Sequence, residues 1–109
     1  MRRIKNEKHL AFIRSLPCVI CADATATEAA HIRYADERAG KRQTGIGEKP
    51  SDQWTIPLCG NHHRAQHSMG EREFWKSVGA DPILIALSLY SVSGDREAGE
   101  QIIQSWQGG

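Results

Sequence analysis

The spacing of cysteine and histidine constrains this chain more than any other feature. Cys18 and Cys21 form a CxxC pair, and Cys59 and His62 form a CxxH pair. A gap of two residues lets both side chains of one turn reach the same ion, and zinc takes four such ligands tetrahedrally. The two pairs predict one structural Cys₃His zinc site. The alternatives are a redox CxxC, which lacks the βαβ pattern such motifs need, and buried thiols without metal.

Length and composition indicate one small soluble domain. The chain has 109 residues, a net charge of +1 and three cysteines, which are too few and too odd in number for a disulfide framework. No apolar run approaches the about 20 residues that a bilayer requires, and the basic N-terminus makes a poor signal peptide. We therefore expect a single domain over residues 1–109 that is cytoplasmic and has no membrane partner.

The hydrophobic pattern predicts an α+β fold. Two short strands are expected over residues 28–33 and 53–58, and the second should stop near Pro57 because proline has no N–H. Polar residues and glycines between the two strands predict a long loop over 34–52. Helices are expected over 5–15, from Gly60 or Asn61 through His67, over 68–79, from Pro82 to Val92, and from Gly94 onward.

The hydrophobic pattern also predicts which residues of the C-terminal third face the core. Phe74, Trp75 and Val78 are expected to face inward on their helix. The helix from Pro82 to Val92 is apolar almost all round, which is typical of a helix at the buried centre of a core. The sequence contains no candidate chemistry here, so the predicted organisation is a zinc-stapled core over 16–68 and a helical C-terminal extension over 70–107.

The helix after Cys59 carries three histidines that need not share one task. His62 and His63 are adjacent and point about 100° apart on a helix. His63 and His67 are four residues apart, so they lie on one face and can share a metal ion. The alternative is a pair of surface histidines. The zinc would bring two strands and this helix together with His31, which ends the first strand, and a ββα-metal arrangement results.

Four segments carry a resemblance to a known family. "LPCVIC", "AAHIR", "WTIPLCGNHH" and "AQH", within residues 16–68, resemble the zinc-containing HNH endonucleases of the ββα-metal superfamily. A longer stretch, to about Pro82, is similar to small phage and prophage HNH proteins, among them recombination-enhancement nucleases that act with a recombinase. The resemblance implies a metal-dependent DNA endonuclease of low sequence specificity. A recombinase partner, and the choice between monomer and homodimer, stay open.

The resemblance also implies roles for three histidines. His31 takes the position of the general base, and an ordinary imidazole pKa of about 6.5 suits a base near neutral pH. His63 and His67 take the positions that hold one catalytic divalent cation. Mg²⁺ prefers oxygen ligands, whereas imidazole suits Mn²⁺, Ni²⁺ or Zn²⁺, so the identity of this cation stays open.

The sequence departs from the family pattern at two positions. Ala30 stands where the family often has an Asp or His ligand, and Trp54 stands where the family usually has the Asn of HNH. Asp52 is the nearest carboxylate. We hypothesise that it replaces a ligand or orients His31, with a turn or capping aspartate as the alternative reading.

Basic residues lie in and around the long loop. We expect these residues to contact DNA phosphates. Such contacts give affinity but discriminate little between DNA sequences. Plain surface charge is the alternative for each residue. The candidates are Arg33, Arg38, Lys41, Arg42, Lys49 and Arg64. A competing function for the whole chain is a zinc-stapled nucleic-acid-binding module or adaptor without catalysis.

Overall fold

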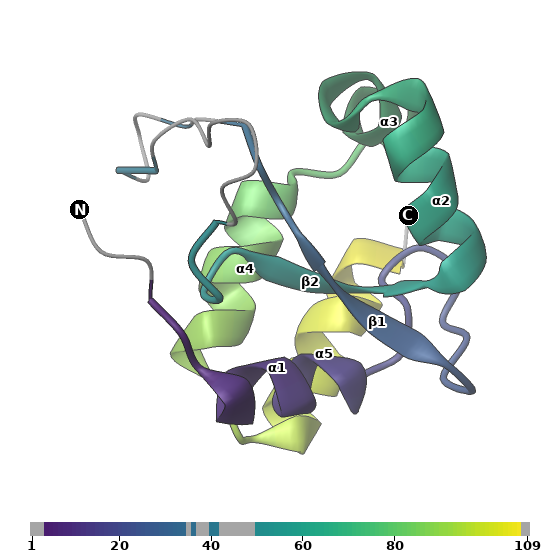
Figure 1. Cartoon of the computed structure of the whole chain (residues 1–109). Coiled ribbons are helices and arrows are strands. Elements are labelled where there is room, and N and C mark those ends of the chain that lie inside the picture. The colour runs from purple at the N-terminus through teal and green to yellow at the C-terminus, as the bar shows by residue number, and fades with distance from the viewer. Residues whose placement is uncertain (1–3, 35, 37–39, 42–49, 108–109) are drawn as a thin grey trace.

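Two strands and five helices make up the part of the chain that the structure describes. It is a computed structural model and describes residues 4–34, 36, 40–41 and 50–107, so Arg38, Arg42 and Lys49 lie outside the described residues. The elements are α1 (Glu7–Arg14), β1 (Thr27–His31), β2 (Thr55–Cys59), α2 (Gly60–Met69), α3 (Glu71–Val78), α4 (Pro82–Ser91) and α5 (Arg96–Gln107). The expected small α+β architecture is confirmed at this level (Figure 1).

The strands pair as an antiparallel ribbon whose register sets the position of the site. Ala30 pairs with Ile56, and His31 pairs with Thr55. β2 runs directly into α2, since Cys59 is both the last strand residue and the N-cap of that helix. Helix α2, which carries His62, His63 and His67, therefore starts beside the first residues of β1.

Pro57 does not end β2, and the expectation that the strand stops there was wrong. The carbonyl oxygen of Pro57 accepts a hydrogen bond from the Val19 N–H, 3.1 Å away and outside the ribbon. The N and O atoms of one residue in an antiparallel strand point to the same side, so the nitrogen of Pro57 also faces away from β1. The missing N–H therefore removes no ladder hydrogen bond, and the strand continues to Cys59.

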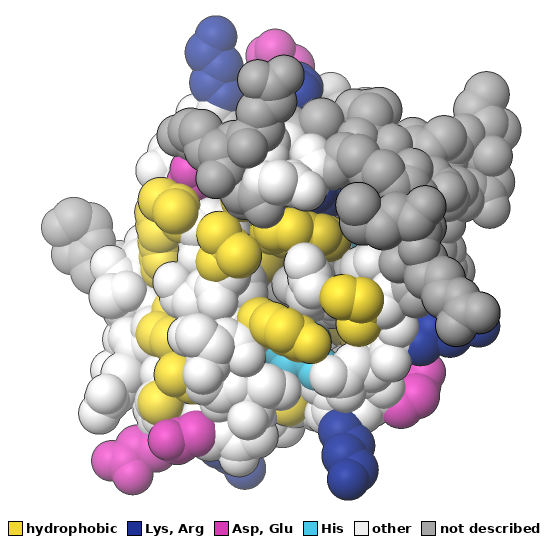
Figure 2. Space-filling model, turned by 90° about the vertical axis from the view of Figure 1, so that its left-hand side faces the viewer, with side chains coloured by type: hydrophobic (Ala, Val, Ile, Leu, Met, Phe, Trp, Pro, Cys, Tyr) yellow, Lys and Arg dark blue, Asp and Glu magenta, His cyan; other side chains and the backbone are white. Residues whose placement is uncertain are grey.

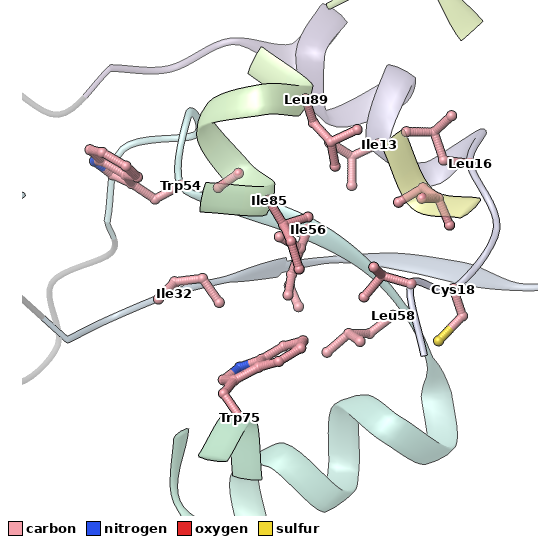
Figure 3. Packing of buried hydrophobic residues seen from close by; sticks show 14 of the residues in the cluster. Ile13, Leu16, Cys18, Ile32, Trp54, Ile56, Leu58, Trp75, Ile85 and Leu89 are labelled. Carbon is pink, nitrogen blue, oxygen red and sulfur yellow. The ribbon is translucent and has the colours of Figure 1, made fainter. Parts of the chain in front are cut away.

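One hydrophobic cluster joins the ribbon to the helices. Ala30 pairs directly with Ile56, so the two side chains point to the same face. Ile32 and Leu58, each two residues further along the chain, are buried in the same cluster. Figure 3 shows Ile85 of α4 next to Ile56, Trp75 of α3 next to Leu58, and Leu89 of α4 beside Ile13, all within one cluster. This cluster fixes the ribbon against α3 and α4.

Two packing expectations for the C-terminal helices were too broad. Phe74 and Trp75 are buried as expected, but Val78 is exposed. On α4, Ile85 and Leu89 are fully buried, whereas Leu84 is 50% exposed. Each helix packs through one face only, so apolar residues on the far face of α4 reach the surface. Figure 2 shows hydrophobic side chains in the middle of one side of the molecule and charged side chains mainly at its rim.

Sequence signals mark the ends of these helices. The Asp81 carboxylate accepts hydrogen bonds from the Ile83 and Leu84 N–H groups, and Pro82 is the first residue of α4, as the Asp-Pro step predicts. Gly79 ends α3 with φ of 80°, a left-handed conformation that glycine adopts without strain. No helix among the described residues combines the length and the apolar character that crossing a membrane requires.

Candidate metal centre and active site

The four predicted zinc ligands lie together. Cys18 and Cys21 come from the turn after α1, and Cys59 and His62 come from the junction of β2 and α2. Their ligand atoms all lie within 4.8 Å of one another. Cys21 Sγ is 3.9 Å from Cys59 Sγ, and His62 Nδ1 is 3.2 Å from Cys59 Sγ. A zinc–sulfur bond of about 2.3 Å in a tetrahedron gives a sulfur–sulfur distance of about 3.8 Å, so this cluster could bind a metal such as zinc.

Local backbone structure forms the first half of this cluster. The Ala22 N–H donates to the Cys18 carbonyl at 2.9 Å, which closes the turn that carries both cysteines. Ala22 has φ of 64°, and the Cys18 N–H donates to the Asp23 carbonyl. The Val19 N–H donates to Pro57, so the turn is attached to β2 two residues before Cys59. Backbone hydrogen bonds therefore hold the two ligand pairs together.

The pKa values of two thiols in this cluster are shifted in opposite directions. Burial opposes ionisation of Cys59, but hydrogen bonds from the backbone N–H groups of His62 and Asn61 and from the other thiols lower its pKa below the ordinary value. A backbone hydrogen bond at Asp23 favours the Cys21 thiolate. Burial and the neighbouring thiols outweigh this bond and raise the pKa of Cys21 to about 11. A metal binds thiolates, so Cys59 is better prepared than Cys21 to receive one.

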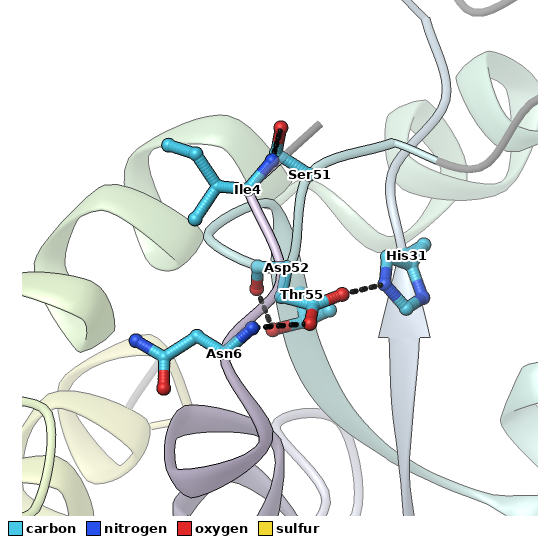
Figure 4. A network of polar contacts seen from close by, with 6 residues as sticks. All are labelled: Ile4, Asn6, His31, Ser51, Asp52 and Thr55. Carbon is cyan, nitrogen blue, oxygen red and sulfur yellow. Dashed lines mark hydrogen bonds and ion pairs between the residues drawn. The ribbon is translucent and has the colours of Figure 1, made fainter. Parts of the chain in front are cut away.

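His31 and Asp52 form a hydrogen-bonded pair at the end of the ribbon. His31 is the last residue of β1, and its Nε2 lies 3.0 Å from Asp52 Oδ1 (Figure 4). The Asp52 side chain is buried, while that of His31 is about one-fifth exposed. A carboxylate can only accept a hydrogen bond, so it holds the imidazole in one orientation with a proton on Nε2. The role of either residue in catalysis remains a prediction.

The start of the chain holds the Asp52 carboxylate in place. Asp52 Oδ2 accepts a hydrogen bond of 2.7 Å from the Asn6 N–H, and the Asp52 N–H donates to the Ile4 carbonyl. The Ile4 N–H donates to Ser51 Oγ, and Thr55 Oγ1 donates to the Asp52 carbonyl. Figure 4 shows the Asn6 and His31 contacts of the Asp52 carboxylate, with Ile4, Ser51 and Thr55 beside it. Sequence reasoning missed the contacts of Ile4 and Asn6, because no local pattern pairs residues so far apart.

The remaining two histidines of α2 lie side by side, and a carboxylate touches one of them. The ring centroids of His63 and His67 are 4.8 Å apart. His63 Nδ1 lies 2.6 Å from Oε1 of Glu28, a β1 residue that sequence reasoning did not single out. The available signal was the period of two along β1, which puts Glu28 on the same face as Ala30.

The structure does not gather every predicted site residue into one cluster. Among the described residues, one group of three or more potential ligands lies close enough to share an ion, and it is the Cys₃His set. Ala30 and Trp54, the two positions at which the sequence departs from the HNH pattern that it resembles, are both buried in the hydrophobic cluster. The Trp54 indole packs and supplies no ligand oxygen.

The described basic residues have different surroundings. Arg64 is exposed on α2, and its guanidinium donates to Asn61 Oδ1 at 2.6 Å. Arg33 is half-buried, and its backbone N–H donates to both oxygens of Glu71. Lys41 is only 5% exposed and lies over the Trp54 ring. Phosphate contact by these residues stays a prediction, and burial makes Lys41 the least accessible of the three.

Comparison with known proteins places the chain in a family. An Escherichia coli (strain K12) protein described as "Uncharacterized protein YdfU" is 31% identical over 67 residues, which cover 62% of this chain and 17% of that protein. The matched part is thus about a sixth of the relative's length. No solved structure matches the chain. The family described as "Protein of unknown function (DUF968)" matches residues 1–92, so this chain belongs to the DUF968 family.

Proposed function

We propose that the protein is a metal-dependent HNH-type endonuclease that hydrolyses DNA phosphodiester bonds with low sequence specificity. The observation that carries this proposal is the His31–Asp52 pair, in which a buried carboxylate holds an accessible imidazole at 3.0 Å. A histidine held in this way is suited to general-base chemistry, because its orientation and its tautomer are set before substrate binds.

The chain's own residues would act on a water molecule. Because Nε2–H of His31 donates a hydrogen bond to Asp52, the lone pair of the neutral imidazole is on Nδ1, which would take a proton from water. The water oxygen then forms a bond to phosphorus, and the bond from phosphorus to the 3′ oxygen breaks. The leaving oxygen takes a proton from solvent, and Asp52 stabilises the imidazolium that forms. His63 and His67 would hold a divalent cation, which supplies charge neutralisation at the phosphate when bound.

The Cys₃His cluster supports the proposal as a structural element. It links the turn after α1 to the start of α2, and α2 carries His63 and His67. A zinc ion with four protein ligands has no open position for substrate, so the proposed role of this zinc is to hold the helix against the ribbon. The proposed cleavage chemistry therefore lies outside the Cys₃His cluster.

A zinc-stapled nucleic-acid-binding module without catalysis is the second candidate. Two observations favour it. Among the described residues, His63 and His67 do not belong to a group of three potential ligands, and Trp54 is buried where HNH endonucleases usually have Asn. A module of this kind would bind DNA through its basic residues and leave the phosphodiester bond intact. The two candidates differ in whether DNA is cleaved, and in whether that cleavage depends on His31.

A plasmid-nicking assay separates the two candidates. Supercoiled plasmid is incubated with zinc-loaded protein and Mg²⁺, Mn²⁺ or Ni²⁺, beside the variants His31→Ala and Thr27→Ala. Thr27 is the matched control because it lies at the other end of β1. The nuclease proposal expects nicking by the wild type and the control, and a loss of about 100-fold or more in His31→Ala. Equal, negligible nicking by all three proteins with retained DNA binding would favour the module.

A further inference from the structure

The contact between Glu28 and His63 bears on which nitrogen of the His63 imidazole carries the proton. We propose that the Glu28 carboxylate holds His63 with its proton on Nδ1, so that Nε2 is the nitrogen offered to a divalent cation. Glu28 is then a positioning residue for the cation site and not a ligand itself. This inference rests on the proposed function, because it takes the His63 and His67 face of α2 as the cation site.

The position of Glu28 follows from the ribbon. Glu28 pairs with Leu58, and β2 passes through Cys59 directly into α2. The second residue of β1 is therefore held near the first turn of α2, where His63 lies. Glu28 Oε1 is 2.6 Å from His63 Nδ1, a short hydrogen bond of the kind that a charged acceptor makes.

The chemistry of the two groups decides where the proton lies. A neutral imidazole has one N–H donor and one lone-pair acceptor, whereas a carboxylate only accepts. The nitrogen that faces Glu28 must therefore carry the proton, and the lone pair of neutral His63 is on Nε2. Metal-binding histidines commonly donate their other N–H to a carboxylate, which fixes the ring and makes the ligating nitrogen more basic.

The geometry distinguishes a positioning role from direct ligation. Within the described residues, Glu28, His63 and His67 do not form a group of three ligand atoms close enough to share an ion. The Glu28 oxygen instead lies against a ring nitrogen of His63, and the His67 ring packs on the same histidine at 4.8 Å. A carboxylate in this place acts on the cation through the imidazole.

Two carboxylates thus hold two histidines through opposite nitrogens. Asp52 contacts Nε2 of His31, and Glu28 contacts Nδ1 of His63. The two tautomers are expected to differ for that reason. This difference can be measured directly, because long-range ¹H–¹⁵N NMR spectra identify which nitrogen of each imidazole carries the proton.

The first test measures tautomers in zinc-loaded protein without a second cation. The expected spectrum has the proton of His63 on Nδ1 and that of His31 on Nε2. In Glu28→Ala the His63 preference should be lost, and in Glu28→Gln it should largely return, because the amide oxygen still accepts from Nδ1–H. Glu97→Gln, on α5, is the control and should leave the spectrum unchanged. A His63 proton on Nε2 in the wild type would overturn the proposal.

The second test measures binding of Mn²⁺ to the same zinc-loaded variants by calorimetry. Glu28→Ala should weaken Mn²⁺ binding about 10-fold or more, the usual effect of removing such a partner, and Glu28→Gln should recover most of it. His63→Ala should remove binding. Equal Mn²⁺ affinity in the wild type and Glu28→Ala would overturn the proposal. Loss of Mn²⁺ binding in Glu28→Gln as complete as that in His63→Ala would also overturn it. Wild type that does not bind Mn²⁺ would also overturn it.

These readouts separate the inference from the proposed function. If His63 shows the expected tautomer and Mn²⁺ binding depends on Glu28 but plasmid remains intact, the nuclease proposal fails and the Glu28 assignment stands. If plasmid is nicked in a His31-dependent reaction while Glu28→Ala changes neither tautomer nor affinity, the assignment of Glu28 fails alone.

Discussion

The backbone N–H of Asn6 donates a 2.7 Å hydrogen bond to the carboxylate of Asp52, and so joins the start of α1 to the loop before β2. The other oxygen of that carboxylate lies 3.0 Å from His31. The orientation of the candidate general base therefore depends on a residue far away in the sequence. Asp52 is buried, so its ionised form relies on these donors.

Substituting Asp52→Ala should reduce DNA cleavage more than it reduces DNA binding. The variant loses the acceptor that keeps the proton of His31 on Nε2, and general-base catalysis contributes about 100-fold or more to rate. We expect kcat to fall by about that factor, measured as the rate of plasmid nicking at saturating protein. Gln101→Ala, an exposed change on α5, serves as the control. Full metal-dependent cleavage by Asp52→Ala would remove Asp52 from the site.

Replacing one cysteine of the Cys₃His cluster should release the zinc and unfold much of the domain. The four ligand atoms lie within 4.8 Å of one another, and a structural zinc contributes its binding free energy directly to folding. Elemental analysis should find about one zinc per chain in the wild type and none in Cys18→Ser or Cys21→Ser. The melting temperature of both variants should fall steeply. Wild-type protein that is folded and metal-free would contradict the structural zinc.

Gly99 allows α5 to approach α1 closely, and alanine at this position should destabilise the protein. An added Cβ would lie 2.9 Å from the Phe12 ring and 3.0 Å from Leu16. Alanine favours a helix by about 1 kcal/mol over glycine. Overpacking typically costs about 1–3 kcal/mol, so a net loss is expected.

Urea unfolding measures this loss of stability. Gln101→Ala, which is exposed on the same helix, should stay within about 0.5 kcal/mol of wild type. If Gly99→Ala proves more stable than wild type, the contact between α1 and α5 is looser than the structure indicates.

Local sequence signals predicted most of the elements but few of the partners. The helix from Pro82 was readable from Asp81-Pro82, because an N-cap and a proline at the first position act within one turn. The gathering of Cys18 and Cys59 was readable because one ion accounts for both ligand pairs. The end of β2 was misread at Pro57, because the cost of a missing N–H depends on which side of the strand faces its partner.

The contacts of the candidate site depend on register, which the sequence does not specify on its own. Glu28 became relevant only once its pairing with Leu58 brought it beside α2. Asp52 was singled out as the nearest carboxylate, but the hydrogen bond from Asn6 was not foreseeable. The exposure of Leu84 likewise follows from how many faces of α4 are covered, which is a property of the whole fold.

His9 should make stability depend on pH. This histidine is fully buried, its Nδ1 lies 2.7 Å from Ser93 Oγ, and its ring packs edge-on against Tyr90. Burial lowers its pKa, and the negative charge of Asp52 offsets only part of that effect. The unfolded chain, with an ordinary imidazole pKa of about 6.5, then binds a proton more readily than the folded protein.

The direction of the effect follows from that difference in proton binding. The contribution of His9 to the free energy of unfolding is fully present above about pH 6.5 and is lost as pH falls from there toward the lowered folded-state pKa. His9→Phe keeps an aromatic ring but cannot titrate, so its free energy of unfolding should fall less between pH 7 and pH 5 than that of wild type. Urea unfolding of both proteins across this range measures the difference. Protonation of the zinc ligands affects both proteins alike, so parallel curves would show that His9 is not the group responsible.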